Sequence, residues 1–197
     1  MPIYLDNAAT TPVCAEAAQA AYRAMTEGFG NPSSRYSLAQ QAAASVKEHR
    51  ETVARCLGCL PEELTFISCG TEGDNWSIRA AAEYGKRKGK HIITTAIEHS
   101  AVLEPLKDLE RQGYEVTYLK PDKAGRISIG DLTAALRPDT ILVSMMLVNN
   151  ELGTILPVAE AVRAVKASGA PALFHCDAVQ GFLKVPFTSK ELGVDLH

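Results

Sequence analysis

The sequence predicts an α/β protein with a mostly parallel sheet and helices on both faces. Two observations support this prediction. Short apolar segments of strand length alternate along the chain with longer segments of helical length. Several of the short segments are apolar throughout, which is typical of strands that are covered on both faces of a parallel sheet. A chain of 197 residues, of which 46% are hydrophobic, is long enough to form one substantial core.

The first part of the chain predicts two helices separated by a loop. Residues 15–28 are Ala-rich and end at a glycine, which is a common helix stop signal. The stretch "GNPSS" at 30–34 combines glycine, proline and serine, and it predicts a loop. Residues 38–58 form a long amphipathic segment, so a second helix is expected there. Its apolar positions include Ala42, Val46, Val53 and Leu57.

The alternation of strands and helices begins with "LTFIS" at 64–68, a short apolar segment that predicts a strand. A helix is expected around 76–87, and "HIITT" at 91–95 predicts the next strand. Residues 100–113 predict another helix. Pro105 fits this helix only if it lies within the first two turns, because a proline deeper in a helix removes a hydrogen bond.

The same alternation continues to residue 176. Residues 114–119 predict a strand, and residues 129–137 predict a short helix. The segment "TILVSMMLV" at 140–148 is apolar throughout and predicts a buried strand. Residues 158–169 predict a helix that ends at a glycine, and residues 172–176 predict a final strand.

Polar side chains follow four of the predicted strands. In open α/β sheets, ligands bind beyond the carboxyl ends of the strands, so these positions are the candidates for chemistry. They belong to the segments "CGTE", "IEHS", "VNNELG" and "CDAVQG". The candidate residues are Thr71, His99, Asn149, Asn150, Asp177 and Gln180.

Gly70 and Thr71 lie where a predicted strand turns into a helix. The backbone N–H groups of a helix N-terminus favour an anion such as phosphate, and a glycine lets the backbone approach it closely. The alternative is that Thr71 is simply a helix cap. Neither G-x-x-x-x-G-K-[ST] nor G-x-G-x-x-G occurs, which argues against a nucleotide-dependent oxidoreductase.

His99 follows a predicted strand and precedes a predicted helix. It is either a core or capping histidine, or an acid/base group that offers a flat surface for stacking. His175 and Asp177 share one face if their strand continues through both residues. His99 could join these two residues as metal ligands. No further acidic residue or cysteine has a fitting spacing, however, so no metal site is expected.

Asp177 follows the apolar run "APALF", and a buried carboxylate is costly unless a positive group meets it. A phosphate site, an imidazole for stacking and a buried carboxylate together suit pyridoxal phosphate. The carboxylate would hold the proton on the ring nitrogen, and this keeps the cofactor an electron sink. The positive partner expected for Asp177 is therefore a pyridinium.

The composition restricts the partners and the location of the protein. The formal net charge is −3 and the basic residues are scattered, so no nucleic-acid partner is expected. No apolar run reaches membrane-spanning length and no secretory signal is visible, so the expected location is cytoplasmic, with no membrane partner. Five cysteines suggest reduced thiols, and the C-x-x-C formed by Cys56 and Cys59 is expected to be structural.

Six segments together resemble the cysteine desulfurases of the pyridoxal-phosphate-dependent class V aminotransferase superfamily. Their occurrence in the right order is far more specific than any single match. The resemblance covers essentially the whole chain. The segments are "YLDNAATTP" (4–12), "FGNPSS" (29–34), "SCGTEGDN" (68–75), "GKHIITTAIEHSAV" (89–102), "VNNELG" (148–153) and "HCDAVQ" (175–180).

The resemblance implies roles for the candidate residues. Gly70 and Thr71 would hold the cofactor phosphate. His99 would stack over the pyridine ring and take part in proton transfers. Asp177 would pair with the ring nitrogen, and Gln180 would hydrogen-bond the phenolic oxygen.

The resemblance also implies how the chain is organised. It would be the large domain of a fold-type I enzyme, truncated, with residues 1–14 as an N-terminal arm and residues 15–197 as an incomplete cofactor-binding domain. Ala9, Thr10 and the loop at 30–34 would border the substrate pocket. Asn150 would lie near the phenolic oxygen and the substrate carboxylate. The C-terminal small domain would be absent.

The activity implied is conversion of L-cysteine to L-alanine and protein-bound persulfide sulfur, for iron–sulfur cluster or thio-cofactor synthesis. The family acts as a homodimer and passes sulfur to an acceptor or scaffold protein. A selenocysteine lyase or a class V aminotransferase is the close alternative, and His99 favours sulfur or selenium chemistry. A non-catalytic fragment or interaction module is the alternative of another class.

Two departures from the family pattern matter. Cys69 and Gly70 stand where the family often has Gly-Ala. The Schiff-base lysine of the family, in a Ser-x-His-Lys motif, and its nucleophilic cysteine would come after residue 197, and neither Lys184 nor Lys190 lies in such a motif. The chain is therefore expected to be an N-terminal half that is inactive alone.

Overall fold

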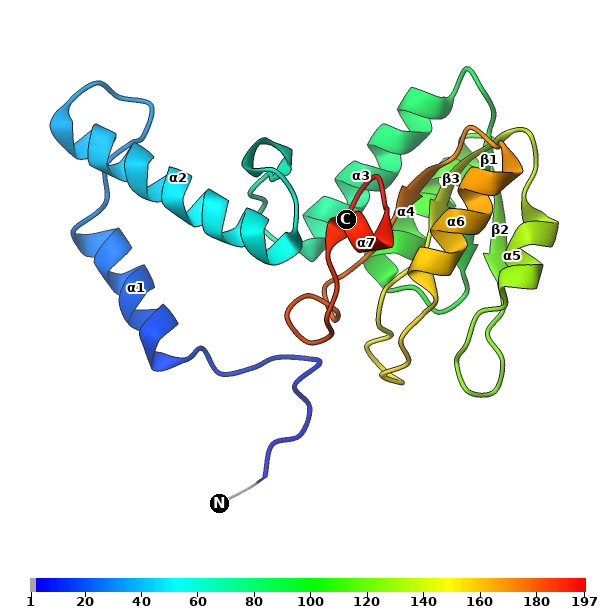
Figure 1. Ribbon diagram of the computed structural model, residues 1–197, viewed down its shortest axis with the longest axis horizontal. Helices are drawn as coiled ribbons and strands as arrows, with labels where there is room; N and C mark the ends of the chain where they lie inside the picture. The colour runs from blue at the N-terminus through cyan, green and yellow to red at the C-terminus, as the bar shows by residue number, and fades with distance from the viewer. Residues whose placement is uncertain (1–2) are drawn as a thin grey trace. The chain divides into compact units, whose positions relative to one another are not determined.

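The computed structural model describes residues 3–197, which form two compact units, one up to Thr65 and one from Phe66 to His197 (Figure 1). The first unit is helical, and its two predicted helices are confirmed. Gly58 ends the longer helix in the left-handed conformation with φ 70°, as a glycine stop requires. The elements of this unit are α1 (Ala15–Thr26), α2 (Ser37–Leu57) and the 3-10 turn η1 (Pro61–Glu63).

The second unit contains a four-stranded sheet with the order β2-β1-β3-β4, and all of its pairings are parallel. This confirms the predicted parallel α/β fold. The strands are β1 (His91–Thr95), β2 (Glu115–Leu119), β3 (Thr140–Ser144) and β4 (Leu173–His175). The helices are α3 (Gly70–Gly85), α4 (Ser100–Arg111), α5 (Ile129–Ala135), α6 (Val158–Ser168) and α7 (Ser189–Leu192).

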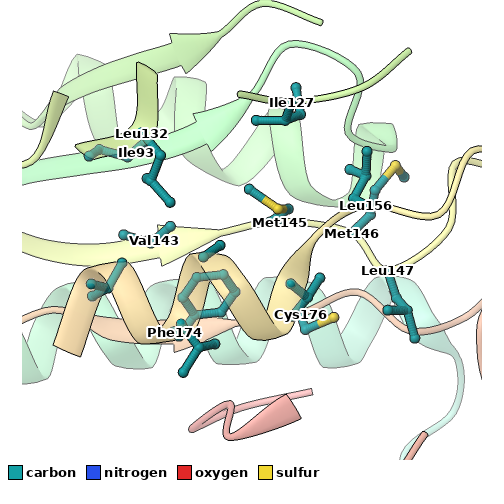
Figure 2. Close-up of a cluster of buried hydrophobic side chains, with 14 of the residues drawn as sticks. Ile93, Ile127, Leu132, Val143, Met145, Met146, Leu147, Leu156, Phe174 and Cys176 are labelled. Carbon is teal, nitrogen blue, oxygen red and sulfur yellow. The ribbon is translucent and has the colours of Figure 1, made fainter. Parts of the chain in front are cut away.

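Two buried hydrophobic clusters cover the two faces of the sheet. One cluster joins Ile92 and Leu142 to helices α3 and α4. The other joins Ile93, Val143 and Phe174 to helices α5 and α6, and Figure 2 shows these three side chains from neighbouring strands. Adjacent residues point to opposite faces, so strands that are apolar throughout bury both faces.

The predicted strand at 64–68 is wrong, because no strand is assigned there in the described chain. Phe66 and Ile67 remain 51% and 41% exposed. An apolar run indicates an extended segment, but a strand also needs a hydrogen-bonded neighbour, and a sequence pattern does not contain that information. Helix α3 begins at Gly70, which confirms the predicted helix start at Gly70 and Thr71, and the Glu72 carboxylate accepts the Ser68 N–H at 2.6 Å beside its first turn.

The carboxyl ends of β3 and β4 extend their pairing beyond the assigned strands. The N–H groups of Met145 and Leu147 donate to the carbonyls of His175 and Asp177 at 3.1 and 2.9 Å. Asp177 is therefore held in line with β4 at the carboxyl edge of the sheet. None of the described helices is long and apolar enough to cross a membrane.

Candidate functional site

The carboxyl edge of the sheet contains a pocket of about 510 Å³ between the segments that follow β1 and β3. Because parallel strands end at the same edge, the residues after each strand meet there. Residues 96–100 and 149–152 line the pocket, and they include the candidates His99 and Asn150. The structure therefore brings together two candidates that are 51 positions apart in the sequence.

Asn149 holds the two segments that line this pocket through hydrogen bonds of its side chain. Its buried side chain donates to the Ile97 carbonyl at 3.0 Å, and its oxygen accepts the N–H groups of Glu151 and Leu152 at 3.0 and 2.8 Å. The neighbouring Asn150 is only half-buried. The two adjacent asparagines therefore have different roles. Asn149 joins the two pocket segments, and Asn150 lines the pocket.

His99 is both a helix cap and a pocket residue. It occupies the N-cap position of α4, where its Nδ1 accepts the Ala101 N–H at 3.2 Å. An Nδ1 that accepts a hydrogen bond places the proton of the neutral ring on Nε2. The exposed ring therefore presents an N–H donor. The capping interpretation of this histidine is confirmed, and its acid/base and stacking role stays a prediction.

Glu98 is a buried residue of the site that the sequence patterns did not single out. Its Oε1 accepts the Thr95 hydroxyl at 2.6 Å and the Met146 N–H at 3.0 Å, while Oε2 is buried without a hydrogen-bond partner among the described residues. Burial raises the pKa of this carboxyl to about 8, and Asp177 and Asp74 add to the rise. Its position after an apolar strand, the signal that identified Asp177, could have identified Glu98 too.

The N-terminus of α3 presents backbone donors. The first backbone hydrogen bond of this helix runs from Gly73 N–H to the Cys69 carbonyl at 3.3 Å, so the N–H groups of Gly70, Thr71 and Glu72 precede it. The pKa of the exposed Cys69 thiol is lowered, first by the Glu72 N–H and then by the Ser68 hydroxyl. This end of the helix therefore favours negative charge.

Gly70 lies against the segment that carries Asp177. A Cβ on residue 70 would stand 2.7 Å from Val179 Cγ2, closer than real contacts allow. The Val179 N–H donates to Asp177 Oδ1 at 2.9 Å. The turn at Gly70 and the buried carboxylate of Asp177 therefore lie side by side, with Val179 in contact with both.

Asp177 is 8% exposed. Burial raises the pKa of its carboxyl, and the nearby Asp74 raises it further, whereas the Val179 N–H, His175 and His99 lower it. A cation beside Asp177 would therefore stabilise the charged form of its carboxyl. Gln180 Oε1 accepts a hydrogen bond from Lys184 Nζ at 2.5 Å.

Helices α3 and α4 also meet near their N-termini. The Asn75 side chain donates to the Thr71 carbonyl at 3.0 Å and to the Ala101 carbonyl at 3.2 Å.

The predicted contributions of Ala9, Thr10 and the loop at 30–34 belong to the first unit and stay predictions. Across residues 3–197, no group of three or more histidine, cysteine or acidic side chains is placed to hold a metal ion.

Comparison with known proteins places the chain in one family. The aminotransferase class-V family model matches residues 3–197. The cysteine desulfurase IscS of Methanosarcina thermophila is 47% identical over 98% of this chain and 48% of its own length. The cysteine desulfurase IscS of Anaeromyxobacter sp. (strain K) is 43% identical over 100% of this chain and 48% of its own length.

Solved structures give the same result. A NifS-like protein matches with a TM-score of 0.96 and 40% identity, over 99% of this chain and 53% of that chain. A protein described as SspA in complex with cysteine matches with a TM-score of 0.92 and 34% identity, over 98% of this chain and 55% of that chain. The chain spans about half the length of the curated relatives that it matches.

Proposed function

The chain belongs to the aminotransferase class-V family, and from this premise we propose that it is the cofactor-binding half of a pyridoxal-phosphate-dependent cysteine desulfurase. The proposal rests on relatives named cysteine desulfurase at 43–47% identity. One observation of the structure carries it. The glycine turn at Gly70 and the buried carboxylate of Asp177 lie side by side through Val179, as an anionic group and a cationic ring on one ligand require.

The residues present fit pyridoxal phosphate. The N–H groups of Gly70, Thr71 and Glu72 precede the first hydrogen bond of α3 and can receive a phosphate. A Cβ at residue 70 would lie 2.7 Å from Val179 Cγ2, so any larger residue there requires the Val179 side chain to shift. When bound, the cofactor supplies an electron sink for changes at the α-carbon of an amino acid.

The proposed roles of the other residues follow from their contacts. Asp177 would hold the proton of the ring nitrogen, and its burial makes such a charged contact worth about 1.5–3 kcal/mol. The Gln180 amide would donate to the phenolic oxygen. His99 would stack on the ring and exchange a proton at Nε2, because Nδ1 is engaged with the Ala101 N–H. Asn150 would contact the substrate carboxylate from the pocket wall.

The reaction proposed for the whole protein is conversion of L-cysteine to L-alanine and a protein-bound persulfide. The cofactor lysine and the cysteine that receives sulfur, by resemblance, would follow residue 197. The 197-residue chain by itself is therefore proposed to bind the cofactor weakly and to release no sulfide. A homodimeric whole protein and a sulfur-acceptor or scaffold partner belong to the same proposal.

Titration of the 197-residue chain with pyridoxal phosphate, followed by fluorescence, tests the proposal. We expect saturable binding that Asp177→Asn and Thr71→Val each weaken about tenfold, since each loses one charge-assisted or polar contact. Lys123→Gln, an exposed residue outside the candidate set, serves as the control and should leave the affinity unchanged. Equal affinity in all four proteins would overturn the proposed site.

Activity assays separate the rival reactions. The 197-residue chain and a full-length protein that contains it are assayed separately. Each is supplied with pyridoxal phosphate and tested with cysteine, with selenocysteine and with keto acids. Sulfide release by the full-length protein but not by the 197-residue chain supports the desulfurase. Turnover of selenocysteine or keto acids faster than that of cysteine supports a rival activity of the same family. Sulfide release by the 197-residue chain well above that of the cofactor alone would contradict its proposed inactivity.

A further inference from the structure

A buried carboxyl holds the turn at 96–98, which joins β1 to α4. Glu98 is 6% exposed, and its Oε1 accepts the Thr95 hydroxyl at 2.6 Å and the Met146 N–H at 3.0 Å. Thr95 is the last residue of β1, whereas Met146 follows β3. A single carboxyl oxygen therefore joins the start of this turn to the segment that leaves the neighbouring strand, 48 positions away in the sequence.

Two further hydrogen bonds hold the same turn. The Asn149 side chain donates to the Ile97 carbonyl at 3.0 Å, and the Ala96 N–H donates to the Leu119 carbonyl, at the end of β2, at 2.9 Å. The turn is thus joined to both strands that flank β1. A carboxyl group is costly to bury, so Glu98 is explained at this position by bonds that an apolar side chain could not make.

His99 follows directly after this turn, and its ring depends on where the turn ends. Its Nδ1 accepts the Ala101 N–H at 3.2 Å, at the long end of the usual range, so a small displacement of residue 99 would break this contact. The residue is exposed, so packing does not hold the ring. The backbone position of His99 therefore decides whether the cap forms and where Nε2–H points.

Glu98 also belongs to the wall of the pocket of about 510 Å³, together with His99 and Asn150. Both hydrogen bonds of its carboxyl go to Oε1, and the buried Oε2 has no partner among the described residues. The carbonyl oxygen of an amide can accept the same two bonds. Glutamine at this position should therefore preserve what the carboxyl does, whereas an apolar side chain should not.

We propose that Glu98 is a positioning residue for His99: its carboxyl holds the turn at 96–98 against the segment after β3, and this fixes the Nδ1 contact of His99 and the direction of its Nε2–H. The importance of a fixed His99 ring for a bound cofactor rests on the proposed function. The effect on His99 itself does not, because it is a property of the chain without any ligand.

Nitrogen-15 NMR of the ligand-free 197-residue chain, labelled at its histidines, tests the proposal. At about pH 7.5 an ordinary histidine is mostly neutral, so the ring shifts report which nitrogen holds the proton, and His99→Gln assigns the signal. The wild type should show one form, with the proton on Nε2. Glu98→Leu should give a mixture of both forms at His99, and hydrogen exchange of the Ala101 N–H should become about tenfold faster.

Three variants show whether the hydrogen bonds of Glu98 are the cause. Glu98→Gln keeps the acceptor and should retain the wild-type signal of His99. Thr95→Val removes one of the two donors and should produce part of the change. Thr94→Val is the matched control, because the buried Thr94 hydroxyl has no partner among the described residues. A wild-type His99 signal in Glu98→Leu, or equal changes in Thr94→Val and Thr95→Val, would overturn the proposal.

A loss of stability alone should not produce the same signal. Val165→Ala removes buried methyl groups near the C-terminal end of α6, from which the chain returns to the start of β4, so it should lower stability and leave His99 unchanged. A mixed signal in this variant would also contradict the proposal. If Glu98→Leu fails to fold, as judged by circular dichroism, Thr95→Val decides alone, and an unchanged His99 in it overturns the proposal.

Titration with pyridoxal phosphate separates this proposal from the proposed function. Glu98→Leu should weaken binding about fivefold. The double variant Glu98→Leu/His99→Gln should bind no more weakly than His99→Gln, because Glu98 acts through His99, and a further loss would contradict this route. Absence of binding by the wild-type chain would refute the proposed function, while the NMR measurements would still support or refute the role of Glu98.

Discussion

Val179 Cγ2 stands 2.7 Å from the place where a Cβ on Gly70 would lie, so the turn that opens α3 and the segment after β4 are fitted to each other. We expect Gly70→Ala to push these segments apart and to weaken pyridoxal phosphate binding at least about tenfold, because overpacking costs about 1–3 kcal/mol. Fluorescence titration measures the affinity.

Two controls belong to the Gly70 experiment. Gly70→Ala/Val179→Ala removes the colliding methyl group and should recover part of the affinity. Gly130→Ala, in α5, should have no effect, because its Cβ would meet only Ser128 Oγ at 3.4 Å. No recovery in the double variant would show that the collision with Val179 is not the cause.

Asn149 and Asn150 should differ in what they support. Asn149→Ala removes one hydrogen bond that joins the two pocket segments and two that hold the turn at 149–152, so the free energy of unfolding should fall by about 2–3 kcal/mol. Asn150→Ala should leave stability within about 0.5 kcal/mol and affect only ligand binding. Urea unfolding of both variants makes the comparison, and equal losses would contradict this division.

Glu98 should make the chain less stable as the pH rises. Its pKa in the folded state is about 8, above the ordinary value of 4.5, so the folded state holds the proton more tightly. Stability is therefore lost from about pH 4.5 to pH 8 and levels off above pH 8, by up to about 5 kcal/mol. Glu98→Gln keeps an acceptor for Thr95 and Met146 and should abolish this decline.

Urea unfolding at pH 5, 7 and 9 measures the effect of Glu98. The stability advantage of Glu98→Gln over the wild type should grow with pH. Glu160→Gln, at an exposed position of α6, should show no such trend. An advantage that is the same at all three pH values would contradict the assignment of the decline to Glu98.

His91 should make the chain sensitive to acid. Its ring is buried at the amino end of β1, where its two nitrogens meet the hydroxyls of Thr140 and Thr117 at 2.8 and 2.9 Å. Burial, assisted by Arg137, lowers its pKa below 6.5. The folded state then binds fewer protons than the unfolded state, so stability is full above pH 6.5 and falls below it.

His91→Gln should reduce this loss of stability below pH 6.5, as thermal unfolding at several pH values would show. The control is His49→Gln, at an exposed position of α2, which should leave the pH profile as it is. A wild-type profile that His91→Gln does not alter would refute the role of His91.

Cys69 should be the most reactive thiol of the second unit. Its pKa is lowered by the Glu72 N–H and the Ser68 hydroxyl, whereas burial raises the pKa of Cys176 well above its usual range. Iodoacetamide at pH 7.5, followed by mass spectrometry, should label Cys69 first and Cys176 last. Phosphate bound at the α3 N-terminus should slow labelling of Cys69 without slowing that of the exposed Cys14.

The fold was largely readable from the sequence. Strands such as 91–95 are buried on both faces, so their apolar runs report a parallel sheet directly, and glycines such as Gly58 and Gly169 mark helix ends through their left-handed conformation. The segment at 64–68 misled because its apolar pattern carries no information about a pairing strand.

The sequence by itself determined the order of strands and helices from residue 91 to residue 175 and the candidate residues after those strands, because burial on both sheet faces and polar strand ends leave a local pattern. The tertiary structure decided what those residues meet. Gly70 faces Val179 across 109 positions, His99 shares a pocket with Asn150, and Asp74 reaches His175 across 101 positions. Such contacts depend on which strands are neighbours and on how helices cross the sheet, so no local pattern of residues contains them.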